Sequence, residues 1–243
     1  MDKVALVTGA SRGIGAATAK LLGKQHYKVC VNYRVNHRLA SEVVEEIISS
    51  GGSAFAFQAD VASEAEVTKL FDAIVEKFGT ITHLVNNAGI LLPQTKLADM
   101  TAARINEMLV TNVTSYFLCC REAIRRMKQG GAIVNVSSAA ARTGSPGEYI
   151  DYAASKGAID TLTRGLALEV AGENIRVNCV RPGFIYTDIH RDGGEPDRVD
   201  RLSAQIPLRR GGSAEEVAAA IAWLLSDEAS YATGSFLDVA GGR

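Results

Sequence analysis

The amino-acid sequence predicts a single doubly wound α/β domain, in which a seven-stranded parallel sheet carries helices on both faces. Short apolar segments alternate with longer segments of helical periodicity along all 243 residues, which is the pattern of a parallel sheet buried between helices. No linker rich in Pro, Gly or Ser divides the chain, so we expect one domain over residues 1–243. A glycine-rich turn follows the first apolar segment, at the edge of the sheet where such folds bind ligands.

Seven apolar segments are short enough to be buried strands rather than helices. They lie at residues 4–7, 29–31, 54–57, 84–85 (the start of a strand), 133–136, 175–180 and 236–239. Segments with helical periodicity connect them, at residues 16–22, 39–48, 67–78, 101–128 and 152–170. A further helix is expected to begin after Ser213 and to run to about residue 225, because Ser213 and Glu216 have the spacing of a capping box.

One long stretch, residues 186–212, shows neither periodicity and is predicted to be irregular. Loops of that length in a compact domain are usually functional. Two Gly-Gly pairs within it offer backbone freedom for a hinge. We therefore predict that this stretch forms a substrate loop that acts as a mobile lid.

The composition excludes several classes of protein. Hydrophobic residues make up 47% and charged residues 22% of the chain, and the formal net charge is −1, so we expect neither a nucleic-acid nor a membrane partner. No signal peptide or membrane-spanning run is visible, which predicts a cytoplasmic protein. The four cysteines lack zinc-ligand spacing, since Cys119 and Cys120 are adjacent, and we expect reduced core thiols and no metal site.

The first turn, Thr8-Gly-Ala-Ser-Arg-Gly-Ile-Gly15, lies between a predicted strand and a predicted helix. Glycines at 9, 13 and 15 allow a ligand to approach the backbone, and the helix N-terminus offers free N–H groups to a pyrophosphate. The general dinucleotide fingerprint G-x-G-x-x-G does not fit, because Thr18 takes its last place. The turn alone therefore leaves a purely structural role open.

Further motifs follow in order along the chain, and together with the turn they resemble the short-chain dehydrogenase/reductase family. The turn is similar to that family's T-G-x-x-x-G-x-G motif, and Asn86-Asn-Ala-Gly89 matches its N-N-A-G motif. Pro182-Gly183 matches a motif after the sixth strand. The resemblance covers essentially the whole chain and implies a Rossmann fold, a nicotinamide cofactor, hydride transfer and a homo-oligomer, commonly a tetramer. It places the four catalytic residues at Asn112, Ser138, Tyr152 and Lys156.

The resemblance and the glycine turn together predict the cofactor-binding residues. They are Gly9, Ser11, Arg12, Gly13, Ile14, Gly15, Asn32, Tyr33, Arg34, Asp60, Val61, Asn86, Ala88, Gly89, Tyr152, Lys156, Pro182, Gly183, Ile185 and Thr187.

The spacing of Tyr152 and Lys156 gives these two residues a chemical rationale. Residues four apart on a helix share one face. A phenol with a pKa near ~10 is a poor base, and a neighbouring ammonium favours its ionised form. A serine hydroxyl can hold the substrate oxygen as charge develops, and the resemblance gives Asn112 a part in a proton relay to the lysine.

One departure from the family pattern lies between these residues. Ser138 and Tyr152 are separated by 152 − 138 = 14 positions, one more than the family's usual spacing. The extra residue falls in the loop 144–151, so the substrate wall is expected to differ. Ser137 is the alternative serine. Tyr149 is a competing tyrosine, but Ala153 stands four positions after it, so we expect a substrate-wall role.

The segment 16–40 predicts NADP(H) rather than NAD(H) as the cofactor. An NAD site normally carries an acidic residue near the end of the second strand to hold the ribose 2′-hydroxyl. This segment contains no Asp or Glu and ends its strand with Asn32-Tyr-Arg34. Arg34 would attract a 2′-phosphate, and Arg12 resembles the second basic residue of NADP-preferring family members.

The sequence thus predicts an NADP(H)-dependent oxidoreductase that interconverts an alcohol and a ketone or aldehyde of small-molecule size. A 3-oxoacyl-carrier-protein reductase is the alternative, for which Arg121, Arg125, Arg126 and Lys128 offer a basic patch to an acidic carrier. A non-catalytic NADP(H)-binding sensor is a third possibility, and the complete set of four catalytic residues argues against it. The segment 223–242 is a candidate oligomer interface.

Overall fold

The computed structural model describes residues 2–243 and contains one seven-stranded sheet in the order β3-β2-β1-β4-β5-β6-β7. Every neighbouring pair of strands is parallel, which confirms the predicted architecture. The strands are β1 (Val4–Val7), β2 (Lys28–Tyr33), β3 (Ser53–Gln58), β4 (His83–Asn86), β5 (Gly131–Val136), β6 (Ile175–Pro182) and β7 (Phe236–Val239).

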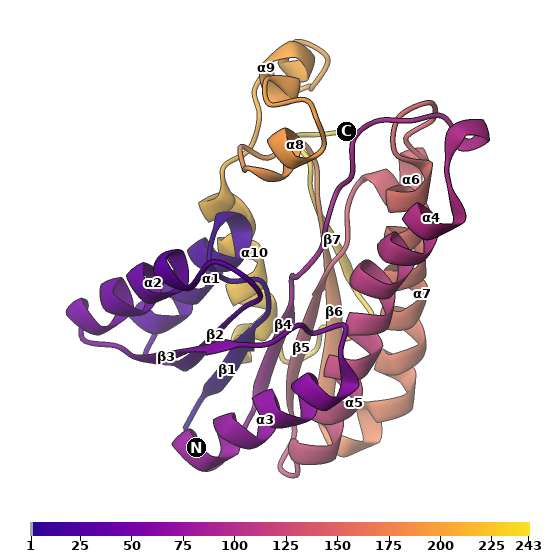
Figure 1. The fold of residues 1–243 in the computed structure, drawn as a ribbon. Helices are drawn as coiled ribbons and strands as arrows, with labels where there is room; N and C mark the ends of the chain where they lie inside the picture. Colours follow the sequence, from indigo (N-terminus) through magenta and orange to yellow (C-terminus); the bar gives the residue numbers. More distant parts are fainter. Residues whose placement is uncertain (1) are drawn as a thin grey trace.

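Helices cover both faces of the sheet, as Figure 1 shows. One face carries α1 (Gly13–Lys24), α2 (His37–Ser49) and α10 (Ala214–Leu225). The other face carries α3 (Glu64–Phe78), α5 (Ser115–Arg126) and α7 (Ile150–Val170). The short helices α4 (Ala102–Leu109) and α6 (Ala140–Thr143) flank α7. The predicted capping box is present at the start of α10, where Ser213 and Glu216 each accept the other's backbone N–H.

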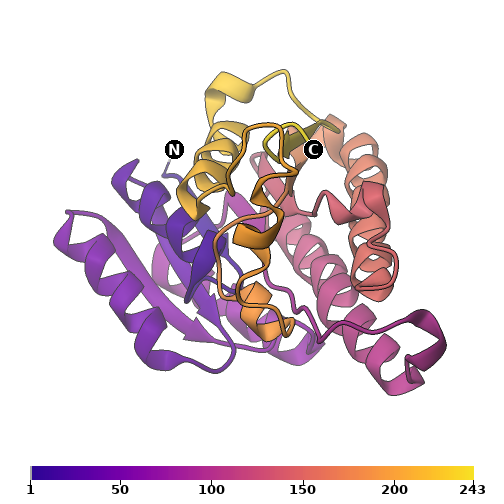
Figure 2. The same ribbon diagram turned by 90° about the horizontal axis from the view of Figure 1, so that it is seen from above.

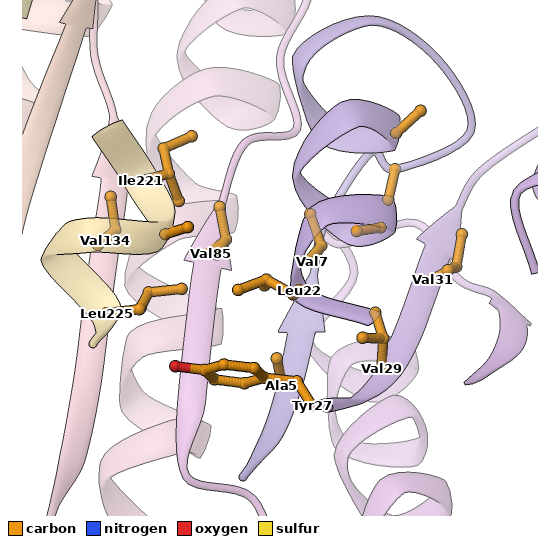
Figure 3. Packing of buried hydrophobic residues seen from close by; sticks show 14 of the residues in the cluster. Ala5, Val7, Leu22, Tyr27, Val29, Val31, Val85, Val134, Ile221 and Leu225 are labelled. Atoms are coloured by element: carbon orange, nitrogen blue, oxygen red, sulfur yellow. The ribbon is translucent and has the colours of Figure 1, made fainter. Parts of the chain in front are cut away.

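Alternating strand residues build two separate cores. In β1, Ala5 and Val7 belong to the core under α1 and α10, whereas Val4 and Leu6 belong to the core under α3 and α5. This alternation follows from the two-residue period of a strand. Figure 3 shows the first core, with Leu22 of α1 and with Ile221 and Leu225 of α10 packed against the strand side chains.

The predicted helix 101–128 is interrupted. The structure has α4, then a π-helical turn η2 (Val110–Thr114), then α5. Single π-turns inside helices are frequent at functional sites. Here the widened turn carries Asn112, which is fully buried, and it could not be predicted from hydrophobic periodicity.

The stretch 186–212 is not wholly irregular, because it contains the short helices α8 (Ile189–Asp192) and α9 (Arg198–Ser203). In the view from above in Figure 2, this segment lies across the middle of the molecule. Figure 1 places it beyond the carboxyl ends of the strands. We call residues 186–212 the lid segment from here on.

Two further features concern the body of the protein. His83 is only 7% exposed, because it begins β4 and packs edge-on against the ring of Tyr27. Among residues 2–243, no helix is both long and apolar enough to cross a membrane.

Candidate active site

The strand order reverses direction between β1 and β4, and a cleft of about 890 Å³ opens at this switch point, where open α/β sheets bind their ligands. Most of the predicted site residues line this cleft. Its lining includes Gly9, Ser11, Arg12, Gly13, Ile14, Asn32, Tyr33, Arg34, Asp60, Val61, Ala88, Gly89, Ser138, Tyr152, Lys156, Pro182, Gly183, Ile185 and Thr187. Gly15, Asn86 and Asn112 do not line it.

The glycine turn is packed too closely to accept side chains. Gly9 has φ +60°, and a Cβ atom there would lie 2.9 Å from Cα of Ala88. Gly15 supports the turn from behind, since a Cβ atom there would lie 2.6 Å from Nδ2 of Asn87. The backbone of this turn therefore forms one wall of the cleft, as a dinucleotide site requires.

The N-terminus of α1 is free to receive an anion. Its N-cap residue, Arg12, makes no side-chain capping hydrogen bond, and the first turn carries no acidic residue. The first N–H groups of a helix have no intrahelical partner, and the helix dipole favours negative charge there. This end of α1, beside Gly13, fits the pyrophosphate of a dinucleotide.

Three polar side chains shape the turn from the neighbouring strands. Oδ1 of Asn32 accepts a hydrogen bond from the N–H of Gly9 at 3.3 Å. The hydroxyl of Thr8 accepts the N–H groups of Asn87 and Ala88 at 2.9 and 3.0 Å. Nδ2 of Asn87 donates to the carbonyl oxygens of Thr8 and Gly9. These contacts fix the cleft wall, and neither Thr8 nor Asn87 was among the predicted site residues.

Asn86 does not reach the cleft. Its side chain points into the body of the protein, where Nδ2 donates to Oδ1 of Asn135 at 2.9 Å. The reason is strand alternation, which turns adjacent residues to opposite sides. Of the two asparagines in the N-N-A-G motif, it is therefore Asn87 that borders the cleft.

Both arginines that we expected to favour NADP(H) line the cleft, Arg34 directly after β2 and Arg12 in the glycine turn. Arg34 is 56% exposed, and its guanidinium lies 4.0 Å from the carboxylate of Asp60 at the end of β3. Arg12 forms ion pairs with Asp192 and, at 3.7 Å, with Asp188, both in the lid segment. No acid in segment 16–40 opposes these arginines, but the fold brings carboxylates to them from distant parts of the chain.

Lys156 is buried beneath the cleft, one helical turn after Tyr152. Its Nζ atom donates hydrogen bonds to the carbonyl oxygen of Val136 at 2.9 Å and to the hydroxyl of Tyr116 at 3.3 Å. The same atom lies 5.6 Å from the ring centre of Tyr152, as the spacing of four residues predicted. Burial lowers the pKa of Lys156 to about 8, because the charged ammonium loses its solvation.

Burial also dominates the pKa of Tyr152. It raises this pKa to about 12, and a hydrogen bond with Ser138 lowers it in part. We had expected the lysine to bring the phenol towards neutral pH, but the ammonium is turned towards Val136 and does not touch the phenol oxygen. In this state the phenol is protonated at neutral pH, so it is set to donate a proton. The pairing with Ser138 also favours this serine over Ser137, which donates to the carbonyl oxygen of Lys156 and is 2% exposed.

Asn112 supports the cleft from behind. Its Oδ1 accepts the N–H of Ile90 at 2.8 Å, and its Nδ2 donates to the carbonyl oxygen of the same residue at 2.9 Å. A Cβ atom added to Gly89 would lie 3.3 Å from Oδ1 of Asn112 and 3.7 Å from Nζ of Lys156. Asn112 therefore positions the loop that follows β4 and stands beside the lysine.

Tyr116 is a site residue that sequence reasoning missed. Its hydroxyl donates to the carbonyl oxygen of Val136 at 2.9 Å and accepts the hydrogen bond from Lys156. It follows Asn112 by four positions, and this helical spacing was the available signal. The apolar surroundings of Tyr116 in the sequence suggested only a core aromatic residue.

The lid segment and the loop before α7 form the remaining wall. The hydroxyl of Tyr149 donates to the carbonyl oxygen of Gly193 at 3.0 Å, which agrees with its predicted place in the wall. The buried Arg198 pairs with Glu148 and Glu195. His190 also lines the cleft, and Nε2 of its ring lies 3.1 Å from the carbonyl oxygen of Ile185.

The fold and the cleft together define a dinucleotide-binding α/β protein, and comparisons with known proteins identify its family. Residues 9–243 match the family model described as Enoyl-(Acyl carrier protein) reductase. The chain is 62% identical to an uncharacterized oxidoreductase, YgfF, of Escherichia coli, over 99% of both chains. It is 40% identical to the 3-oxoacyl-[acyl-carrier-protein] reductase FabG of Staphylococcus aureus, over 100% of this chain and 98% of the relative. It is 38% identical to glucose 1-dehydrogenase 2 of Bacillus subtilis, over 99% of this chain and 94% of the relative.

The chain belongs to the short-chain dehydrogenase/reductase family of oxidoreductases. Membership implies a nicotinamide cofactor. The free N-terminus of α1 and the side-chain-free turn at Gly9 fit such a cofactor.

Proposed function

We propose that this protein is an NADP(H)-dependent oxidoreductase that interconverts a secondary or primary alcohol with the corresponding ketone or aldehyde. The observation that supports the proposal most directly is the convergence of Ser138, Tyr152 and Lys156 on the cleft that the glycine turn borders. When bound, the nicotinamide supplies or accepts the hydride. The remaining chemistry, which is proton transfer and stabilisation of charge on the substrate oxygen, falls to side chains of this protein.

Each of these side chains has a role that follows from its position. The protonated phenol of Tyr152 donates a proton to the substrate oxygen during carbonyl reduction and accepts it back during alcohol oxidation. The hydroxyl of Ser138, already paired with the phenol, holds the same substrate oxygen. The ammonium of Lys156 stabilises the phenolate that proton donation leaves behind. Asn112 is a positioning residue, because it contacts the loop at Ile90 rather than the reacting atoms.

The proposed preference for NADP(H) rests on Arg34 and Arg12, which line the cleft. Arg34 is exposed in the cleft and has no carboxylate neighbour in its own segment. A 2′-phosphate would gain charge-assisted hydrogen bonds there, whereas the 2′-hydroxyl of NAD(H) would find no acid in the segment after β2 to accept its proton.

Steady-state turnover of a carbonyl panel with NADPH tests the proposal. Tyr152→Phe is expected to lower kcat by about two orders of magnitude or more, the usual scale for a lost general acid, and to leave the Kd for NADPH nearly unchanged. Tyr27→Phe is the matched control, because it removes the same hydroxyl from a buried tyrosine that does not line the cleft. Near-normal turnover in Tyr152→Phe would contradict the mechanism. The same experiment tests the alternative of a non-catalytic sensor, which predicts no turnover in the unmodified protein.

The alternative of an acyl-carrier-protein partner gains no support from the predicted basic patch. Arg121, Arg125 and Arg126 all pair with the buried carboxylate of Glu122. Arg121 also pairs with Glu64, and Arg126 with Asp72. Of the four predicted basic residues, Lys128 is the one that forms no ion pair among residues 2–243. An acidic carrier would therefore meet arginines whose charges are largely balanced, so we favour a small-molecule substrate.

We also propose that the protein works as a homo-oligomer, a tetramer by family resemblance, in the cytoplasm. In the predicted interface segment 223–242, Trp223 is 43% exposed and Tyr231 is fully exposed. Large exposed aromatic side chains of this kind are typical of protein interfaces. The four cysteines are free thiols, which agrees with a reducing compartment.

A further inference from the structure

Asp192 and Asp188 of the lid segment contact the arginine that would bind the cofactor's 2′-phosphate. Arg12 stands in the glycine turn, and Asp192 lies 180 positions further along the chain, at the end of α8. Nη2 of Arg12 donates to the carboxylate of Asp192, and Nη1 lies 3.7 Å from the carboxylate of Asp188. The three side chains are between 39% and 45% exposed, so the pairs are open to exchange with a ligand.

The charges around this corner of the cleft are balanced. Asp188 is shared between Arg12 and Arg191, at 2.8 Å from the latter. Arg34 faces Asp60 at 4.0 Å. A 2′-phosphate carries up to two negative charges, and it would enter a corner where three arginines are already neutralised by three aspartates, Asp60, Asp188 and Asp192. A phosphate can bind the exposed Arg34 directly, since Asp60 lies 4.0 Å away, but at Arg12 it competes with carboxylates that already face both terminal nitrogens of the guanidinium.

We propose that Asp192, assisted by Asp188, competes with the 2′-phosphate for Arg12 and so limits how strongly this protein discriminates NADPH from NADH. The inference rests on the proposed NADP(H) site and adds a determinant of cofactor selectivity outside that site, on the lid segment. NADH lacks the 2′-phosphate, so it leaves the ion pair between Arg12 and Asp192 intact. The 2′-phosphate of NADPH can bind Arg12 only if it replaces Asp192 as the partner of that arginine.

Titration of the purified full-length protein with NADPH and with NADH tests the proposal. Asp192→Asn is expected to lower the Kd for NADPH about threefold to fivefold, the scale of an exposed ion pair, and to leave the Kd for NADH unchanged. The double variant with Asp188→Asn should lower the Kd for NADPH further. An unchanged Kd for NADH also shows that the variant protein is folded.

Asp197→Asn is the matched control. It removes the same charge from the same segment, at an exposed aspartate that forms no ion pair with any residue in 2–243. A loss of affinity for NADPH in Asp192→Asn, or an effect no larger than that of Asp197→Asn, would overturn the proposal. The first result would mean that Asp192 holds Arg12 in place for the phosphate, and the second that only the net charge matters.

The variant Arg12→Gln completes the test as a double-mutant cycle. In the Arg12→Gln background, Asp192→Asn should change the Kd for NADPH no more than Asp197→Asn does, because the guanidinium for which Asp192 and the phosphate compete is absent. If Asp192→Asn lowers the Kd for NADPH by the same factor in the Arg12→Gln background as in the unmodified protein, the proposal is also overturned. A protein that binds neither cofactor would instead refute the proposed function, so the two failures are distinguishable.

Discussion

Nζ of Lys156 and the carbonyl oxygen of Val136 are joined by a 2.9 Å hydrogen bond at the carboxyl end of β5. This contact directs the ammonium away from the phenol oxygen of Tyr152 while keeping it 5.6 Å from the ring centre. The hydroxyl of Tyr116 contributes a second acceptor for the ammonium. These two acceptors hold a lysine whose pKa is lowered by burial and raised in part by Cys179 and Asp160.

The pH dependence of carbonyl reduction tests this arrangement. Lys156, with a pKa of about 8, carries its positive charge below that pH and loses it above. Because the cation stabilises the phenolate left by Tyr152, kcat/KM for reduction is expected to fall as the pH rises through about 8. Tyr116→Phe removes an acceptor that favours the charged form, so the midpoint should move to lower pH. A flat profile between pH 7 and 9, or an unmoved midpoint in Tyr116→Phe, would contradict this account.

The cofactor corner gives a second prediction. Arg34→Asp should raise the Kd for NADPH by about tenfold to a hundredfold, because a charge-assisted contact is worth roughly 1.5–3 kcal/mol, and should spare NADH. Arg38→Asp is the matched control, since Arg38 is 74% exposed, pairs with Glu42 and does not line the cleft. Equal dissociation constants for the two cofactors in the unmodified protein would show that the proposed preference is wrong.

Most of the fold could be predicted from the sequence, because the strands are short apolar runs and the segments between them show helical periodicity. For β7, Phe236–Val239, both the first and the last residue agree with the prediction. The π-turn at Asn112 could not be predicted, since it depends on the partners that this amide finds at Ile90. The site residues were predicted by motif, and the exception at Asn86 shows the limit. A motif names a segment, but strand alternation decides which of two adjacent asparagines faces the cleft.

The ion pairs of the cleft and of α5 could not be predicted from the sequence. The sequence around Arg34 contains no acidic residue, which suggested that its charge was unpaired. In the folded protein, Asp60 lies beside Arg34, and the two aspartates of the lid segment pair with Arg12. The same applies to the basic run of α5, where Glu64 and Asp72 of α3 pair with Arg121 and Arg126. The linear charge pattern therefore did not reveal these ion pairs, because they form between residues that only folding brings together.

His83 predicts a pH dependence of stability. Burial lowers its pKa to about 4, and the nearby cations Lys3 and Arg176 add to this effect. Between pH 6.5, its usual pKa, and pH 4 the unfolded chain binds a proton that the folded protein excludes. The free energy of unfolding should therefore have its full value above pH 6.5 and fall by up to about 3 kcal/mol as the pH decreases to 4.

Denaturant unfolding at a series of pH values checks this prediction. His83→Gln removes the titrating ring, so it should flatten the dependence between pH 6.5 and 4. His26→Asn is the control, because His26 is exposed and asparagine tolerates its φ of 64°. The same slope in His83→Gln as in the unmodified protein would assign the dependence to other groups.

The lid segment gives the last prediction, because its backbone is held to the body mainly at its ends. The N–H of Tyr186 donates to the carbonyl oxygen of Gly212 at 2.9 Å, and Leu208 donates to that of Gly241 at 3.1 Å. Between residues 187 and 207, the backbone hydrogen bonds within the described chain all stay inside the segment. Side chains make the remaining contacts, among them Tyr149 with Gly193, Glu148 with Arg198, Arg12 with Asp192 and Gln94 with Glu195. The side chains of Val199, Leu202 and Ile206 are buried.

We therefore expect amides 187–207 to exchange rapidly with solvent in the free protein, since their protection depends on the short helices α8 and α9. Binding of NADP⁺ together with an alcohol substrate should slow this exchange, as the segment orders over the nicotinamide. Hydrogen exchange followed by mass spectrometry measures both states, and the amides of β5, which lies between β4 and β6 in the sheet, serve as an internal reference that stays protected throughout. Strong protection of residues 187–207 in the free protein, unchanged by ligands, would mean that the segment is a rigid connector. Slowed exchange confined to α8 would instead mean that only its first half closes, with Arg198 and Glu148 keeping α9 fixed.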